Sequence, residues 1–133
     1  MISEKLTYTD YNGKERTETY YFNLSKAELT ELENSVDGGF GAYINRIRDA
    51  ENIPELVKVF KEIILMSYGE KSDDGKYFLK KKNGVRLAEM FEQTEAYSTL
   101  FMKLATDDKA AARFINGIIP ADMRAQLPSS PNA

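Results

Sequence analysis

A dipeptide near the start of the chain, Asn12-Gly13, lies between two segments rich in Thr and Tyr. An Asn-Gly pair is the strongest short signal for a two-residue hairpin turn, because both centres of a type I′ turn need a positive φ angle. Thr and Tyr favour strands on either side of that turn. The sequence therefore predicts a β-hairpin over residues 2–23. A lone hairpin is marginally stable in water, so it must pack on the rest of the chain or gain strands from another chain.

A two-residue turn at this dipeptide also predicts the strand register, in which Tyr8 faces Thr17. Successive strand residues point to opposite faces, so Tyr8 would lie on one face and Tyr20 and Phe22 on the other. Aromatic side chains on both faces require either two covering layers or a partner on one face. Under the second alternative, the predicted partner-binding residues are Tyr8, Tyr20 and Phe22.

Helical periodicity and capping residues predict about six helices after the hairpin. Ser25 and Glu28 form a capping box, in which each side chain satisfies a backbone N–H group that lacks a helical partner. Thr94 is the predicted N-cap of the fifth helix, and Thr106 or Asp107 that of the sixth. The third helix is apolar around most of its circumference and is expected at the centre of the core. The expected helices cover approximately residues 25–36, 43–50, 54–66, 87–91, 94–105 and 107–119.

A turn-rich segment separates the third and fourth helices. Asp73-Asp74-Gly75 predicts a tight turn. Residues 77–79 are expected to form a short strand that pairs near Tyr68, and residues 80–84 a polar loop. The segment is therefore interpreted as a connector between helices.

The expected fold class is α+β and mostly α, with the hairpin followed by the helices in one compact, bundle-like domain. A chain of 133 residues suits one domain with one core. That domain is predicted over residues 1–125, with the hairpin at 2–23 and the helical part at 25–125. The Pro- and Ser-containing end, residues 126–133, is predicted to be a flexible tail.

The composition excludes several classes of chemistry. The chain has no Cys and no His, which removes thiolate catalysis, the commonest general base and the commonest transition-metal ligand. This composition lowers the expectation of an enzyme without excluding one, and we predict no catalytic, cofactor-binding or metal-binding residues and no enzyme activity. A net charge of −3 argues against a nucleic-acid partner. No apolar run approaches the roughly 20 residues of a membrane helix, and the first residues lack a secretory pattern, so a cytosolic protein without a membrane partner is expected.

Two features of the connector suggest binding sites. Asp73 and Asp74 suggest calcium, but the Glu that an EF-hand loop needs at its twelfth position is replaced by Gly84 or Val85. Residues 70–86 carry six basic and three acidic side chains, a local excess that could bind phosphate or an acidic partner. The alternative is a solvated loop, because exposed Lys residues commonly have no partner.

Three ordered motifs give the sequence a family resemblance. They are Tyr68-Gly69-x-Lys71-Ser72-x-x-Gly75-x-x-Phe78, then Phe91-x-x-Thr94-x-Ala96-Tyr97-x-x-Leu100, then Phe114-Ile115-x-Gly117-Ile118-Ile119-Pro120. With these motifs the chain resembles the tail assembly chaperones of long-tailed, siphovirus-like bacteriophages. The resemblance extends from the Thr- and Tyr-rich start to Pro120.

The resemblance implies a non-catalytic protein that acts in the host cytoplasm during infection. Such proteins bind the tape measure protein, keep it soluble and help recruit tail tube subunits around it. They are absent from the finished virion, and many are also made in a longer, frameshifted form. Two alternatives remain: a structural virion component, such as a tail or head–tail connector subunit, and a phage regulator that binds nucleic acid through residues 71–86. An unpaired hairpin edge predicts self-association as a homo-oligomer.

Overall fold

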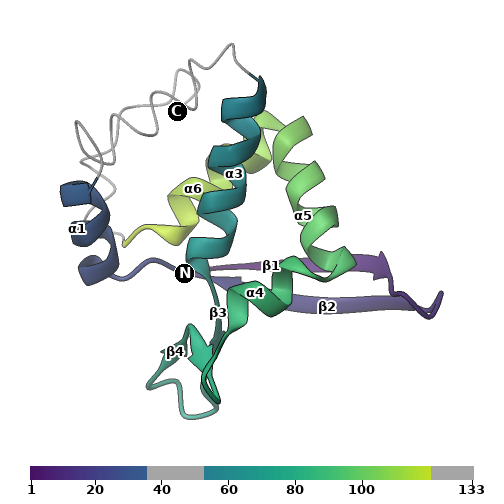
Figure 1. Ribbon diagram of the computed structural model, residues 1–133, viewed down its shortest axis with the longest axis horizontal. Helices are drawn as coiled ribbons and strands as arrows, with labels where there is room; N and C mark the ends of the chain where they lie inside the picture. Colours follow the sequence, from purple (N-terminus) through teal and green to yellow (C-terminus); the bar gives the residue numbers. More distant parts are fainter. Residues whose placement is uncertain (36–52, 121–133) are drawn as a thin grey trace.

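An N-terminal hairpin forms the base on which the helices pack in the computed structural model, which describes residues 1–35 and 53–120 (Figure 1). Four strands form one antiparallel sheet in the order β1-β2-β3-β4, and β5 pairs with β6. Helices α5 and α6 contact β1, and α4 contacts α3, α5 and β3. The elements are β1 (Ile2–Thr9), β2 (Glu15–Phe22), α1 (Lys26–Ser35), α3 (Ile53–Ser67), β3 (Tyr68–Lys71), β4 (Phe78–Leu79), β5 (Lys81–Lys82), β6 (Val85–Arg86), α4 (Leu87–Glu92), α5 (Glu95–Thr106) and α6 (Asp108–Ile118).

The predicted fold class is confirmed in part. The described residues contain an N-terminal antiparallel pair of strands and five helices rather than six, so the structure is mixed rather than a helical bundle with one hairpin. The helix expected at residues 43–50 and the tail expected at 126–133 lie outside the described residues. The division into a domain of residues 1–125 and a tail therefore stays a prediction.

The turn of the hairpin differs from the predicted type I′ turn. Gly13 has a φ of 78°, but among the described residues other than glycine only Asn83 has a positive φ, so Asn12 does not. The Asp10 side chain accepts hydrogen bonds from the backbone N–H groups of Asn12 (2.9 Å) and Lys14 (3.0 Å). Gly13 N–H also donates to the Asp10 carbonyl (2.9 Å). These bonds favour a three-residue loop with a left-handed glycine, a common hairpin form.

The longer loop shifts the register by one residue, so the predicted arrangement of the hairpin faces was wrong. Tyr8 faces Arg16 instead of Thr17, and Ile2 faces Phe22. A one-residue slip moves a whole strand's side chains to the other face. Tyr20 and Phe22 therefore share the helix-covered face with Tyr8, while the opposite face carries the exposed Thr7, Thr9, Thr17 and Thr19.

The connector after α3 forms an arm, residues 70–86, which projects away from the helices (Figure 1). The predicted short strand is confirmed: β4 pairs with β3, with Lys71 opposite Phe78. The predicted polar loop, residues 80–84, instead contains β5 and the turn that joins it to β6, formed by Asn83 (φ 52°) and Gly84 (φ 78°). This second Asn-Gly pair has the two positive φ angles of a type I′ turn, the conformation that was expected at the first pair.

An aromatic cluster joins the sheet to the helices. The Phe22 ring lies 5.6 Å from Tyr68, 5.8 Å from Phe91 and 5.1 Å from Phe114, measured between ring centroids. Tyr68 stacks on Phe91 with centroids 4.2 Å apart and planes inclined by 9°. Phe22, Phe91 and Phe114 are each buried to 98% or more. Aromatic pairs at such distances add to the stability gained from burial alone.

Gly117 lets α6 approach β1, and its replacement is expected to destabilise the protein. A Cβ at this position would lie 2.7 Å from both Cβ and Cδ1 of Ile2. We expect Gly117→Ala to lower the free energy of unfolding by about 1–3 kcal/mol, as for other overpacked contacts. In an Ile2→Gly background the same change should be neutral or stabilising, because the clash is removed and Ala is the better helix former. Urea unfolding of the four proteins measures this coupling, and equal effects of Gly117→Ala in both backgrounds would contradict it.

Candidate partner-binding surfaces

The three predicted partner-binding residues lie on one face of the hairpin but differ in exposure. The Phe22 side chain is fully buried in the aromatic cluster. Tyr8 and Tyr20 are half-buried, and their hydroxyl oxygens lie 3.2 Å apart. The structure therefore brings the two tyrosines together and places Phe22 behind them, in the core. Partner binding by Tyr8, Tyr20 and Phe22 stays a prediction.

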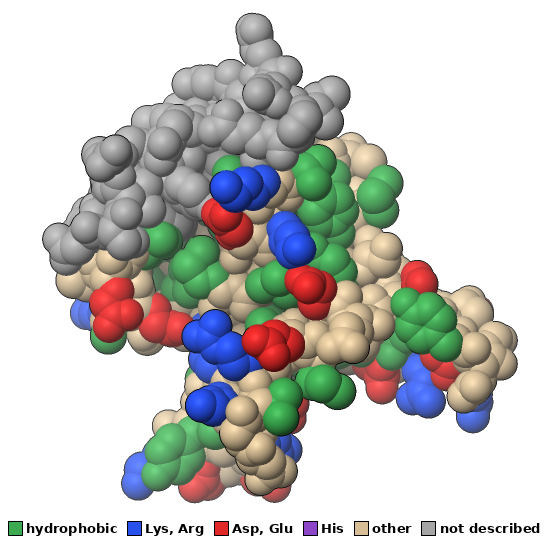
Figure 2. All heavy atoms as spheres, viewed as in Figure 1, with side chains coloured by type: hydrophobic (Ala, Val, Ile, Leu, Met, Phe, Trp, Pro, Cys, Tyr) green, Lys and Arg blue, Asp and Glu red, His purple; other side chains and the backbone are tan. Residues whose placement is uncertain are grey.

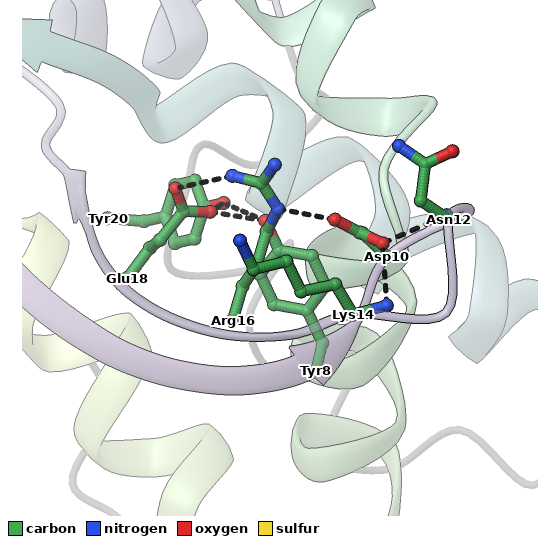
Figure 3. A network of polar contacts seen from close by, with 7 residues as sticks. All are labelled: Tyr8, Asp10, Asn12, Lys14, Arg16, Glu18 and Tyr20. Atoms are coloured by element: carbon green, nitrogen blue, oxygen red, sulfur yellow. Dashed lines mark hydrogen bonds and ion pairs between the residues drawn. The ribbon is translucent and has the colours of Figure 1, made fainter.

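A polar network surrounds the two tyrosines (Figure 3). The Tyr8 hydroxyl donates to the Glu18 carboxylate, and the Tyr20 hydroxyl donates to the same oxygen, Oε1, at 2.8 Å. Arg16 pairs with Asp10 at 2.6 Å and lies 3.8 Å from the other Glu18 oxygen, Oε2. Every buried polar side-chain atom of the described residues has a hydrogen-bond partner.

The protonation states in this network match its hydrogen bonds. The hydrogen bonds from Tyr8 and then Tyr20 lower the pKa of Glu18, so the carboxylate stays ionised and accepts. Burial is the main reason that the pKa values of Tyr8 and Tyr20 are raised, and both hydroxyls stay protonated and donate. The network therefore consists of satisfied donors and acceptors and holds the outer half of the hairpin in shape.

A first depression of about 310 Å³ lies where β2 and β3 separate. The two strands pair only at Tyr21–Gly69 and Phe22–Tyr68. Beyond these pairs β3 leaves the sheet and enters the arm, which opens a notch between the hairpin and the arm (Figure 2). The sequence predicts pairing of residues near Tyr68 with the strand at 77–79 but not with β2, so it does not predict this depression. It is lined by Glu18, Thr19, Tyr20, Tyr21, Tyr68, Gly69, Glu70 and Lys71.

A second depression, of about 370 Å³, is the α3–α4 groove. Its apolar lining includes Leu65, Met66 and Ala88, and its charged lining comprises Glu28, Lys80, Arg86, Glu89 and Glu92. Met90 of α4 is 56% exposed. An apolar lining with charged residues around it is typical of grooves that accept an amphipathic helix. The sequence predicts a third helix that is apolar around most of its circumference, and the structure shows that Leu65 and Met66 on this helix are partly exposed.

Lys80 joins the arm to the rest of the molecule beside this groove. Its ammonium donates to the carbonyls of Asn23 (3.0 Å) and Met66 (2.7 Å) and to the Glu28 carboxylate (2.9 Å). Burial by itself raises the pKa of Glu28, but hydrogen bonds from Ser25 and Lys80 outweigh it, and the pKa lies below its usual value. The groove wall is therefore held by an ionised pair that also satisfies two backbone carbonyls.

Several basic side chains of the arm contact other side chains of the same chain. Lys80 is engaged as described, Lys82 lies 3.7 Å from Glu70, and Lys71 lies over the Tyr21 ring at 5.9 Å. In the predicted tight turn, Asp74 accepts hydrogen bonds from the Ser72 hydroxyl (2.7 Å) and from Lys76 N–H (3.0 Å). The carboxylate of Asp74 therefore has its hydrogen-bond partners within the turn itself.

Residues 1–35 and 53–120 contain neither a metal-binding cluster nor a membrane-spanning helix. Within those ranges, no three acidic side chains come together in a way that could hold a metal ion. In the same part of the chain, no helix has the length and apolar character needed to cross a bilayer.

Comparison with known proteins gives one match. A family model described as phage tail assembly chaperone matches residues 1–130. No curated protein and no solved structure matches the chain. The matched range includes every element of the sheet, the arm and the helices that form both depressions.

Proposed function

The chain belongs to the phage tail assembly chaperone family, and we propose that it binds the tape measure protein and helps recruit tail tube subunits to it without catalysis. The family match over residues 1–130 is the observation that carries this proposal. The proposal includes action in the cytoplasm of the infected host and absence from the mature virion. It also includes Tyr8, Tyr20 and Phe22 as a contact region, with Phe22 acting from the core by positioning the strand.

The α3–α4 groove supports the proposal as the place where a partner helix docks. Amphipathic helices bind by laying an apolar face into an apolar groove. Leu65, Met66 and Ala88 supply such a surface, and the surrounding carboxylates and cations can pair with the polar face of the incoming helix. Methionine adapts its shape to different partners, which suits a surface that binds a partner helix.

Co-expression with the tape measure protein of the same phage tests the proposed function. The wild-type protein should raise the soluble fraction of the tape measure protein and co-purify with it. Ala88→Arg puts a large cation into the groove and should reduce co-purification by about tenfold or more, as loss of a central contact does. Ser98→Arg, a matched change at an exposed position of α5, should leave it unchanged.

Two results would contradict the proposal. One is no gain in solubility and no co-purification with the wild-type protein. The other is stoichiometric presence of the chain in purified virions, which would favour a structural component of the particle.

A further inference from the structure

Most of β2 has an open edge. On one side β2 pairs with β1 along its whole length, from Glu15 to Phe22. On the other side only Tyr21 and Phe22 are paired, with β3. Among the described residues no strand covers the remaining stretch, residues 15–20, on that side. Figure 2 shows that the notch between the hairpin and the arm leaves room beside this edge.

The backbone groups on the open edge can be assigned from the register. In an antiparallel pair the hydrogen-bonded residues alternate with non-hydrogen-bonded ones. The Asp10 N–H donates to the Lys14 carbonyl at the hairpin end, so the even-numbered residues of β2 bond toward β1. The N–H and C=O groups of Glu15, Thr17 and Thr19 therefore point outward. An unpaired row of this kind is a template for another strand.

The side chains of the open edge are complementary to themselves. If a second copy of β2 pairs antiparallel with Thr17 opposite the partner's Thr17, then Arg16 faces the partner's Glu18 and Glu18 faces the partner's Arg16. Among the described residues, the Glu18 oxygen Oε2 makes one ion-pair contact, at 3.8 Å with Arg16, so it can accept a second cation. Opposite charges directly across two strands are stabilising, and like charges are destabilising.

The same charges reject the neighbouring registers. Outward backbone groups belong to odd-numbered residues, so allowed registers differ by two residues. Sliding one way sets Arg16 opposite the partner's Arg16, and sliding the other way sets Glu18 opposite the partner's Glu18. One register therefore combines paired backbones with paired charges, which is how strand registers are specified.

The hairpin tip fits the same arrangement. In the register centred on Thr17, the partner's Lys14 lies opposite Tyr20, so the partner's turn reaches the depression between β2 and β3. Tyr11, at that turn, is 76% exposed, the highest value among the large apolar side chains of the described residues. Its hydroxyl hydrogen-bonds Glu95, which raises its pKa, and its ring is available for a contact at the mouth of the depression. Each copy would thus supply Tyr11 to a depression on the other.

We infer that two copies of the chain associate through the β2 edge, in a two-fold antiparallel pairing centred on Thr17. The pairing joins the two hairpins into one continuous sheet and covers the open stretch of β2, residues 15–20, in each copy. Its contact area is small, so the dimer dissociates on dilution in the micromolar range. This association goes beyond the proposed function and requires no phage partner.

A pair of proline variants tests which edge is used. Thr17→Pro removes an outward N–H from the β2 edge without touching the bonds to β1, and proline is tolerated on such edges. Thr7→Pro is the matched control, because Thr7 lies opposite Thr17 and the two hydroxyls are hydrogen-bonded at 2.9 Å, so either variant loses that bond. Sedimentation equilibrium should show a dimer for the wild type and for Thr7→Pro. Thr17→Pro should weaken dimerisation by about tenfold or more.

Charge-reversal variants test the register. Arg16→Glu alone and Glu18→Arg alone set like charges opposite each other, and each should be monomeric. Mixed together, they restore two opposite-charge pairs and should form a heterodimer, a rescue that misfolded variants would not give. A monomeric wild type up to millimolar concentration would overturn the inference. So would a dimer that is lost in Thr7→Pro but kept in Thr17→Pro, or two charge variants that never associate when mixed.

Discussion

Phe22→Ala is expected to lower the free energy of unfolding by about 3–5 kcal/mol, the usual cost of truncating a buried Phe. Phe22 is fully buried and contacts three aromatic rings from three different elements: Tyr68, Phe91 and Phe114. Small domains have a total stability of only about 5–15 kcal/mol, so this loss is a large fraction of the total and should shift the denaturation midpoint strongly. The reason is a cavity at the point where the sheet, α4 and α6 meet.

Chemical denaturation followed by circular dichroism measures this loss. Tyr21→Ala is the matched control, because Tyr21 is the neighbouring aromatic residue and points to the opposite, solvent-facing side of the sheet. It should cost much less than Phe22→Ala. Equal effects of the two substitutions would contradict the observed register, because in that register Phe22 points into the core and Tyr21 points to solvent. The register predicted from the sequence puts Phe22 on the face opposite Tyr8.

Gly69→Ala is the second change for which a large effect is expected. An added Cβ would lie 2.6 Å from the carbonyl oxygen of Leu79 and 2.6 Å from Cε2 of Phe78. The carbonyl belongs to the backbone of β4 and cannot move without disturbing the pairing of β3 with β4. We expect a loss of about 1–3 kcal/mol or more, typical of an overpacked contact that cannot relax. The pairing of β3 with β4 should open before the rest of the molecule unfolds.

Native-state hydrogen exchange reports this local effect. In Gly69→Ala the backbone amides of the arm should exchange faster, and the Lys80 contacts with Asn23 and Glu28 should be lost with them. Lys71→Ala, an exposed position on the same strand, serves as the control and should leave the exchange pattern unchanged. Unchanged protection in both variants would show that the strand can shift to accept the extra methyl group.

Several of the residues that carry the family resemblance lie in the core or at close contacts between elements. Tyr68, Phe91 and Phe114 belong to the aromatic cluster, and Gly69 and Gly117 are the two described glycines where a Cβ would meet a neighbour. Their spacing in the sequence therefore reflects packing between elements that are distant along the chain. The groove and the open edge of β2, which we propose as working surfaces, include only a few of these residues.

Helix starts were predictable because the bonds that define them are local. Ser25 and Glu28 exchange their predicted hydrogen bonds at 3.0 and 3.1 Å. The Thr94 hydroxyl accepts from Tyr97 N–H at 3.2 Å, and Asp107, rather than Thr106, caps α6. Each cap involves residues within three positions of one another, so the local sequence contains all the information needed.

The two Asn-Gly pairs show where local information fails. The same dipeptide forms a type I′ turn at Asn83-Gly84 and part of a longer loop at Asn12-Gly13. The difference at the first pair comes from the Asp10 carboxylate, which binds two backbone N–H groups and an arginine. One extra loop residue moves the side chains of β2 to the opposite faces of the sheet. Phe22 is therefore buried in the core instead of lying on the face opposite Tyr8.

The sequence by itself determined the hairpin, the helix caps, the short strand after the tight turn and the membership of a family. These features depend on backbone preferences and on bonds between near neighbours. Only the tertiary structure decided which face of β2 is buried, how β3 adds to the sheet and where the two depressions lie. Those features depend on contacts between residues such as Phe22 and Phe114, 92 positions apart in the chain. Local preferences are too weak to specify such contacts, and the burial of the whole aromatic cluster selects among the arrangements they allow.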